Sequence, residues 1–545
     1  MKNILFIVFT FLSFLSYSQE FGRKDSLRGY LFEQRSCYDV HYYHLKISVK
    51  PNDKFITGFS EIHFNAITSF QEIQIDLFQN MSISRILFEG REQPFEREYD
   101  AVFITFDRQI EEGENSFIRV YYEGNPKVAV NPPWNGGFSW EKDSLGFDWV
   151  GVSCQGLGAS SWWPNKDHQS DEPDSMLISC QVPGGLQCIS NGNLRYHDLR
   201  KSTNLYNTYH WFVSYPINNY DVTLNIGNYT HFNDIHITES DTLDLDYYVL
   251  SYNLEKAQKH FKQVKPMLTC LEKYFGPYPF PNDGYALVET PYLGMEHQSA
   301  IAYGNKYRNG YLGNTRFTAG LDFDYIILHE TGHEWWGNSI TANDIADMWI
   351  QETFCTYSEV LFVECMYGYD AMINYVQNQM KMAKNKRPIV GIRNVHFKGS
   401  SDMYAKGSAV LHTVRNLIEN DSLWFDIIVS MTDEFKYQTI DGKDVINYIN
   451  EKSGYNFNTL FQQYLNHYKL PILEYKLTGF GKHKILKYRW NAIEGFDMPI
   501  KVTKSKKSFE WIYPTTQWKE LNIKIWRKDF DIAHHLFLIN SKQFF

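Results

Sequence analysis

The sequence predicts a multidomain α+β protein. It begins with an N-terminal β-sandwich or saddle, continues with a mainly helical middle domain, and ends in a small C-terminal β domain. With 545 residues, the chain is longer than one hydrophobic core normally organises. Alternating segments rich in β-branched and aromatic residues dominate both ends, whereas helical periodicity dominates the middle. We therefore expect domains at residues 19–247, 248–470 and 471–545, after a removable leader at 1–18.

The first domain is predicted from short strand-like runs, such as YYHLKISVK at 42–50 and FITGFSEIHF at 55–64. Turn residues such as NPPWNGG separate these runs. The chain is 43% hydrophobic and 17% aromatic, with a net charge of -10, which fits a globular protein. No basic stripe dominates, so a nucleic-acid partner is not expected, and a small molecule or peptide fits better.

Helical patterns begin near residue 252 and continue to about 470. They cover 322–337, 349–366, 370–384, 404–418, 422–434, 443–452 and 457–467. The stretch 285–303 is predicted as two strands around a tight bend. Strand patterns return at PILEYKLTGF and continue to the last residues of the sequence.

The first 18 residues predict a secretory signal peptide. Lys2 precedes an apolar run from Ile4 to about Leu15, and small residues follow at Ser16 and Ser18. The run is shorter than the roughly 20 residues of a membrane-spanning helix. We therefore expect an exported protein, periplasmic or extracellular, whose mature chain does not span a membrane.

The chain has seven cysteines, and an exported protein tolerates disulfides. Cys180 and Cys188 could bridge two neighbouring strands, and the odd count leaves at least one thiol unpaired within the chain. No pair has the CxxC spacing of a structural zinc site or a thioredoxin-like redox pair.

The stretch LHETGHEWWGNSI, at 328–340, carries the chemistry of the middle domain. His329 and His333 stand four apart, so on a helix both imidazoles can reach one metal ion. Glu330 sits close enough to contact a water at that ion without occupying the metal. Eighteen residues separate His333 from Glu352, a third candidate ligand at the start of the next helical pattern. Salt-bridged surface helices are the alternative, but the apolar flanks favour a buried cation site.

These motifs resemble the aminopeptidase N family of zinc metallopeptidases, which also contains the leukotriene epoxide hydrolase branch. The likeness rests on H-E-x-x-H, the eighteen-residue gap and the frame from Trp349 to Phe354. It extends upstream to the segment 293–297 and downstream to the Y-x-K-G segment 404–407. It covers most of the chain up to about Pro471, where many members add a large C-terminal helical array. The resemblance implies a thermolysin-like catalytic domain at 248–470.

The resemblance also implies a role for each matching residue. One Zn²⁺ per chain would be held by His329, His333 and Glu352. Glu330 would be the general base, and Tyr404 would donate a hydrogen bond to the oxyanion. The substrate's α-ammonium would be bound by Glu296, helped by Gln155, within a pocket that includes Gly294 and Met295. The implied activity is removal of N-terminal residues from peptides that have a free N-terminus.

This chain departs from the family pattern at three positions. Leu293 replaces a glycine, His297 replaces an asparagine, and Ser160 stands where an arginine is usual. Glu359 lies seven residues after Glu352 on the same helix face, so it is either a carboxylate that orients a metal-binding histidine or an ordinary helix residue.

Three other functions stay open from the sequence. A thermolysin-type endopeptidase shares the zinc helix but has no use for Glu296. The epoxide hydrolase of the leukotriene branch keeps the same residues. A non-catalytic zinc-bearing binding protein would need neither Glu330 nor Tyr404.

Overall fold

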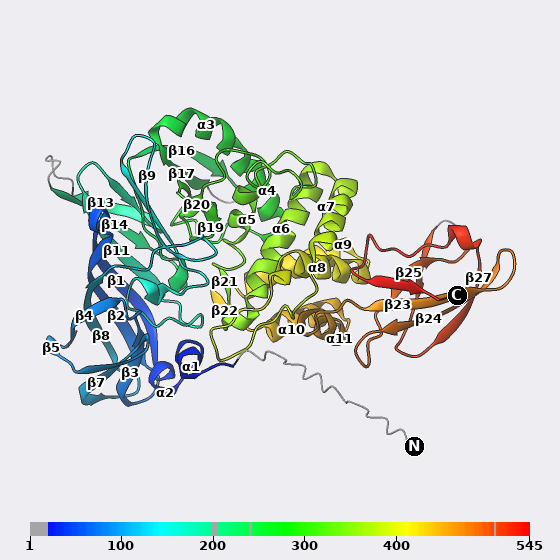
Figure 1. Cartoon of the computed structure of the whole chain (residues 1–545), viewed down its shortest axis with the longest axis horizontal. Coiled ribbons are helices and arrows are strands. Elements are labelled where there is room, and N and C mark those ends of the chain that lie inside the picture. The colour runs from blue at the N-terminus through cyan, green and yellow to red at the C-terminus, as the bar shows by residue number, and fades with distance from the viewer. Residues whose placement is uncertain (1–19, 199–204, 239–241, 506–507, 545) are drawn as a thin grey trace, which may run out of the picture.

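A computed structural model describes residues 20–198, 205–238, 242–505 and 508–544. The predicted signal peptide lies outside these residues. The described chain is elongated, with a strand-rich N-terminal part, a helical middle part and a strand-rich C-terminal part in series (Figure 1). This arrangement agrees with the predicted fold class.

The N-terminal part is built around an eight-stranded sheet. Its order is β13 (Asn193–Asp198), β14 (Tyr206–Val213), β11 (Ser175–Pro183), β1 (Tyr38–Lys50), β2 (Phe55–Ala66), β8 (Asn115–Gly124), β4 (Met81–Phe88) and β5 (Arg91–Glu92). β1 and β11 run parallel, whereas the other pairs are antiparallel. On β1 the apolar residues Tyr43, Leu45, Ile47 and Val49 are buried, as their alternation predicts.

Two smaller sheets complete this part. One contains β3 (Phe70–Asp76), β7 (Ala101–Ile110) and β6 (Phe95–Glu98); the other contains β12 (Gln187–Ile189), β15 (Asn225–Gly227), β10 (Asp148–Ser153) and β9 (Gly137–Lys142). Two short helices, α1 (Arg23–Gly29) and α2 (Glu33–Ser36), precede β1. The core of this part also contacts the middle part, because it includes Tyr292, Met295 and Ala302.

The middle part combines a five-stranded sheet with helices. The sheet order is β16 (Tyr229–Ile237), β17 (Thr242–Leu250), β18 (Tyr285–Glu289), β20 (Ile301–Tyr303) and β19 (Gly294–Met295). The limit predicted at residue 247 therefore falls inside β17, and the sheet of the middle part begins at Tyr229. The domain limits themselves stay a prediction.

The helices follow the predicted patterns in order but not always in number or length, because the one pattern that begins near residue 252 forms two helices. They are α3 (Leu254–His260), α4 (Val264–Phe275), α5 (Tyr325–Gly332), α6 (Trp349–Tyr367), α7 (Tyr369–Met382), α8 (Ala405–Ile418), α9 (Asp421–Glu434), α10 (Gly442–Ser453) and α11 (Asn458–Phe461). The strands β21 (Ile340–Ala342) and β22 (Gln438–Ile440) form a small parallel pair. The prediction of one helix over 322–337 was too long, because the chain turns after Gly332 and Gly337 takes a φ of 130°.

The C-terminal part contains a four-stranded sheet and a two-stranded one. The sheets comprise β27 (Lys519–Lys524), β24 (His483–Asn491), β23 (Ile472–Thr478) and β28 (Asn540–Gln543), and β25 (Ile500–Thr503) with β26 (Phe509–Ile512). Its buried residues are continuous with those of the helical part in one hydrophobic cluster. A buried hydrogen bond from Tyr464 to the carbonyl of Leu538, 2.7 Å long, also joins the two parts.

The disulfide that the sequence offered as a possibility, between Cys180 and Cys188, is not the one in the structure. Cys270 on α4 bonds to Cys365 on α6, whereas Cys180 and Cys188 are buried free thiols. Cys180 is on β11 of the eight-stranded sheet and Cys188 is on β12 of a different sheet, and their thiols lie close enough to interact but are not bonded to each other.

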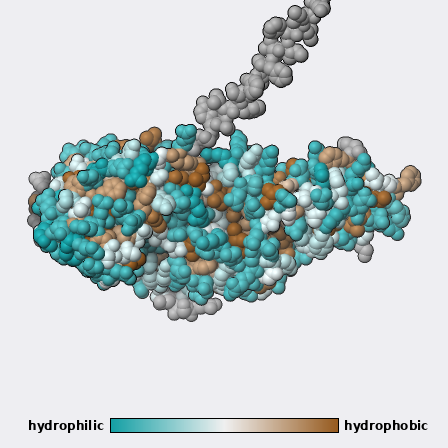
Figure 2. Space-filling model, turned by 90° about the horizontal axis from the view of Figure 1, so that it is seen from below, coloured by the Kyte–Doolittle hydropathy of each residue, from teal (hydrophilic) through white to brown (hydrophobic). Residues whose placement is uncertain are grey.

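Two observations describe the surface. No helix among the described residues is long and apolar enough to cross a membrane. Hydrophilic residues cover most of the face seen in Figure 2, and hydrophobic residues form scattered groups between them.

Candidate metal centre and active site

The two histidines lie at the C-terminal end of α5. Asp324 caps the other end of this helix, where its carboxylate accepts hydrogen bonds from the backbone amides of Ile326 and Ile327. His333 directly follows the last helical residue but keeps helical dihedral angles of -65° and -21°. Its ring centroid is therefore 5.0 Å from that of His329, and both imidazoles face the same space.

A glycine contact brings the third candidate ligand to this space. A Cβ atom at Gly332 would stand 2.6 Å from the hydroxyl of Ser358, so only glycine lets α5 approach α6 this closely. Glu352 lies in the first turn of α6 and is buried. The close approach of the two helices explains how His333 and Glu352, which have 18 residues between them, converge.

The geometry of these three side chains fits a metal ion. The Oε2 atom of Glu352 lies 3.8 Å from Nε2 of His329 and 3.5 Å from Nε2 of His333. Two ligands of a tetrahedral zinc ion, bonded at 2.0–2.1 Å, are separated by roughly 3.4 Å. Oε2 is buried and has no hydrogen-bond partner among the described residues, which would be costly without a cation.

The other ring nitrogens are held by the protein. Nδ1 of His329 is 2.8 Å from a carboxylate oxygen of Glu359, and Nδ1 of His333 is 2.8 Å from the carbonyl oxygen of Trp336. A histidine that donates its Nδ1 proton presents Nε2 as the free ligand atom. Glu359 is itself fixed by the hydroxyl of Tyr375, which donates a hydrogen bond of 2.7 Å to it. It is therefore placed to orient the imidazole of His329, which is the first of the two alternatives that the sequence left open for this residue.

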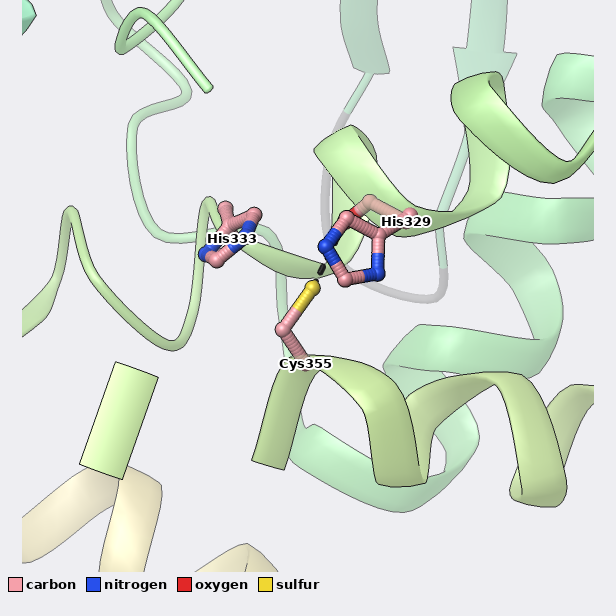
Figure 3. Close-up of side chains that lie close together, drawn as sticks. All are labelled: His329, His333 and Cys355. Atoms are coloured by element: carbon pink, nitrogen blue, oxygen red, sulfur yellow. Dashed lines mark hydrogen bonds between the residues drawn. The ribbon is translucent and has the colours of Figure 1, made fainter. Parts of the chain in front are cut away.

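A cysteine that sequence reasoning did not assign to the site also lies beside the histidines. Cys355 extends from α6 toward His329 and His333 (Figure 3). Its thiol donates a hydrogen bond of 2.7 Å to the backbone carbonyl of His329. Because the thiol is engaged there and Oε2 of Glu352 is unpartnered, Glu352 fits the role of third ligand better. The sequence did offer one signal for Cys355, because it lies three residues after Glu352 and thus close to the same face of the helix.

A hydrogen-bond chain connects the ligand carboxylate to Glu296. The hydroxyl of Tyr404 donates to Oε1 of Glu352 at 2.7 Å. The amide of Gln155 donates to the same oxygen at 3.1 Å and to Oε1 of Glu296 at 2.5 Å. Tyr220, which the sequence analysis missed, also donates to Glu296 at 3.3 Å. Gln155 and Tyr220 come from the N-terminal strand-rich part, so two parts of the chain build this site.

A cavity of about 420 Å³ contains the predicted site residues. Its lining includes all nine of them, namely Gln155, Gly294, Met295, Glu296, His329, Glu330, His333, Glu352 and Tyr404. Aromatic side chains from Trp134, Tyr311, Phe317 and Tyr325 line other parts of the wall. A volume of this size is typical of sites for small ligands, such as short peptides.

The site is charged and buried, and this shifts its pKa values. Burial raises the pKa of Glu330 to about 7. Burial also raises the pKa of Glu296. Although burial opposes the charge of His333, Cys355, Glu296 and Glu352 raise the pKa of its imidazole well above the usual value. Carboxylates that raise histidine pKa values in one cavity make a strong site for a cation.

The departures from the family pattern have local explanations. Leu293 lines the cavity. His297 is fully buried outside the cavity lining, and burial lowers the pKa of its imidazole to about 3, so it is neutral. The hydroxyl of Ser160 hydrogen-bonds to Asp167 at 2.5 Å. None of the three donates a hydrogen bond to Glu296 among the described residues.

Sequence comparisons identify relatives of the middle part. Residues 253–464 match the Peptidase family M1 domain. A leucyl aminopeptidase of Saccharolobus solfataricus is 21% identical over 345 residues, 61% of this chain and 42% of the relative. An aminopeptidase N of Lactococcus lactis is 23% identical over 220 residues, 37% of this chain and 25% of the relative. The match thus spans less than half the length of either relative.

Solved structures share the fold. An M1 zinc metallopeptidase from Deinococcus radiodurans has a TM-score of 0.65 at 20% identity, covering 79% of this chain and 94% of that chain. A mutant of it bound to a Tyr-Ser-Ala substrate has a TM-score of 0.65 at 20% identity, covering 80% and 95%. Residues 253–464, in the middle of this chain, thus match the Peptidase family M1 domain, and the chain shares its fold with M1 zinc metallopeptidases.

Proposed function

We propose that this protein is a zinc-dependent aminopeptidase that hydrolyses the N-terminal peptide bond of peptides. The M1 domain, the aminopeptidases among its relatives and the M1 zinc metallopeptidase fold support this proposal. We propose a role for each site residue as part of the same function.

The observation that carries the proposal is the bridge between two carboxylates. One amide group of Gln155 hydrogen-bonds to both Glu296 and Glu352, so an ammonium-binding group lies beside the cation site. In a peptide, the N-terminal nitrogen and the first carbonyl carbon are only about 2.5 Å apart. A peptide whose ammonium binds Glu296 therefore presents its first peptide bond to the cation.

The cation site would hold Zn²⁺ through His329, His333 and Glu352. When bound, this ion would polarise the scissile carbonyl and activate water. Manganese or cobalt could occupy the same ligand set.

The remaining chemistry belongs to side chains of the chain itself. Glu330 accepts the proton of the attacking water and passes it to the leaving amine, a role that its buried position in the cavity beside the two histidines allows. The hydroxyl of Tyr404, now hydrogen-bonded to Glu352, turns to the carbonyl oxygen as negative charge develops there.

Selection for a free N-terminus rests on Glu296. Its carboxylate is buried and surrounded by Gln155 and Tyr220, which fix its position. An acylated or internal peptide segment would leave this carboxylate without a cationic partner, which is costly in a buried site. The chain should therefore act as an exopeptidase.

The test is hydrolysis of a panel of amino-acid amides, with and without an N-acetyl cap, before and after chelation of metal. Cleavage of uncapped substrates alone, lost on chelation and restored by zinc, would support the proposal. Equal cleavage of capped substrates would remove the role of Glu296 and favour an endopeptidase. Zinc binding without cleavage of either would favour a binding protein or a substrate that is not a peptide.

We also propose that the protein is exported. The apolar run predicted as a signal peptide and the Cys270–Cys365 disulfide support an oxidising compartment. Mass spectrometry of the protein recovered from cells should find a chain that lacks residues 1–18, and an intact N-terminus in fully active protein would contradict the proposal.

A further inference from the structure

Two lysines line the wall of the cavity that contains the acidic site. Glu296, Glu330, Glu352 and Glu359 all line the cavity, and Lys384 and Lys398 are its basic residues besides the two histidines. Among the described residues, neither ammonium group lies within 4.0 Å of a carboxylate. The cavity therefore presents carboxylates at the cation site and two unpaired positive charges elsewhere on its wall.

Lys384 is held in place through its backbone. The amides of Lys384 and Asn385 each donate a hydrogen bond of 2.7 Å to the carboxylate of Asp402, which is buried. Its ammonium donates to the hydroxyl of Ser401 at 3.1 Å. One of its three donors is thus used, and its charge is not neutralised.

Lys398 lies beside Gly156 on the cavity wall. Its Nζ atom is 3.7 Å from the position that a Cβ atom at Gly156 would take, and Gly156 directly follows Gln155. Its ammonium has no hydrogen bond or ion pair to any residue that the structure describes. An ammonium that is free of internal partners keeps all three donors for a ligand.

Both lysines belong to one loop, residues 383–404, whose two ends are tied together. The amide of Ser400 donates to the carbonyl of Pro388 at 3.1 Å, and Gly399 packs directly on the carbonyl of Ile389. The loop therefore fixes the backbone positions from which the two lysines reach the cavity wall.

A short peptide has complementary charges, because its N-terminal ammonium and its C-terminal carboxylate lie only a few residues apart. Each extended residue spans about 3.3–3.6 Å, and a cavity of about 420 Å³ holds a ligand of this size. We propose that Lys384 and Lys398 bind a carboxylate of the substrate, so that the enzyme selects anionic peptides. The inference rests on the proposed aminopeptidase function.

The carboxylate could come from the C-terminus of a di- or tripeptide or from an acidic side chain. Two substrate pairs separate these sources. The first pair is a tripeptide with two alanines after a cleavable first residue, as the free acid and as the C-terminal amide. The second pair carries glutamate or glutamine at the second position, both as C-terminal amides.

We expect kcat/KM to be about tenfold higher for the anionic member of at least one pair, a size typical of two partly exposed ionic contacts. The double variant Lys384→Gln/Lys398→Gln should reduce this ratio to about 1, whereas arginine at both positions should preserve it. The matched control is Lys386→Gln, since Lys386 is exposed on the same loop but does not line the cavity. Both lysines of the pair are exposed as well, so the double variant should fold.

A higher kcat/KM for the free acid of the first pair would identify short peptides as the substrate class. A higher kcat/KM for the glutamate peptide of the second pair would identify peptides with an acidic residue next to the cleaved bond. Equal kcat/KM within both pairs, or a ratio that survives in the double variant, would overturn the inference while leaving the aminopeptidase intact. No cleavage of any uncapped peptide would instead overturn the proposed function.

Discussion

Replacing Gly407 by alanine tests how the tyrosine of the site is positioned. A Cβ atom at this position of α8 would lie 2.0 Å from the hydroxyl oxygen of Thr353 on α6. Ordinary contacts begin at 3.4 Å, so the helices must separate by about 1.4 Å. Thr353 cannot rotate away freely, because its hydroxyl donates to the carbonyl of Met403 at 2.6 Å. The shift would pull Tyr404, at the start of α8, away from Glu352.

The expected cost follows from the size of this shift. A displacement of about 1 Å in a catalytic group lowers rates by about 10²-fold, so we expect kcat/KM on an uncapped amide substrate to fall by about 10². Overpacking should also lower the free energy of unfolding by about 1–3 kcal/mol. Zinc content should stay at one per chain, because the candidate ligands lie on α5, on α6 and just after α5.

Two further variants make this reasoning testable. Gly156→Ala is the matched control, because Gly156 lines the same cavity but its Cβ would meet only Lys398, at 3.7 Å. Thr353→Ala in the Gly407→Ala background removes the blocking oxygen and should restore part of the lost activity. Steady-state kinetics, metal analysis and urea denaturation would measure these effects. Activity within twofold of the parent protein for Gly407→Ala would refute the argument.

Three other outcomes are expected. Glu330→Gln should lower kcat by about 10²–10⁴ while zinc content persists; loss of the metal together with activity would point to a structural role instead. Because the pKa values of His329 and His333 are raised, these groups carry protons in the metal-free protein, and zinc must displace them. Zinc affinity should therefore fall as pH falls, and calorimetry in two buffers of different ionisation enthalpy should show proton release near pH 7; equal heats in both would contradict this. Cys270→Ser/Cys365→Ser opens a loop spanning 95 residues and should reduce the free energy of unfolding by about 4–5 kcal/mol in urea denaturation; an unchanged midpoint would show that the bond contributes nothing.

Helical periodicity predicted most helices of the middle part well. The pattern 404–418 became α8 from Ala405 to Ile418, and 422–434 became α9 from Asp421 to Glu434. These limits are local, because Asn420 caps α9 by accepting a hydrogen bond from the backbone of Leu423. The end of α5 was missed, because the residues after Gly332 continue in turns closed by local backbone hydrogen bonds, such as that from Trp335 to the carbonyl of Gly332, and Gly337 takes a positive φ.

The sequence by itself determined which chemistry we predict for the site, because that prediction rests on short spacings between residues. His329, Glu330 and His333 fall on one side of one helix end through helical geometry alone. The resemblance to a known family then predicted roles for Glu296, Glu352 and Tyr404, and these residues line one cavity in the structure.

Only the tertiary structure decided what surrounds that chemistry. Gln155 and Tyr220 contact Glu296 from 141 and 76 positions away, respectively. The pairing of Cys270 with Cys365 spans 95 positions. The two cavity lysines likewise depend on how a loop folds back over the site. Contacts between distant segments arise from packing and chain topology, which leave no periodic signal in a single sequence.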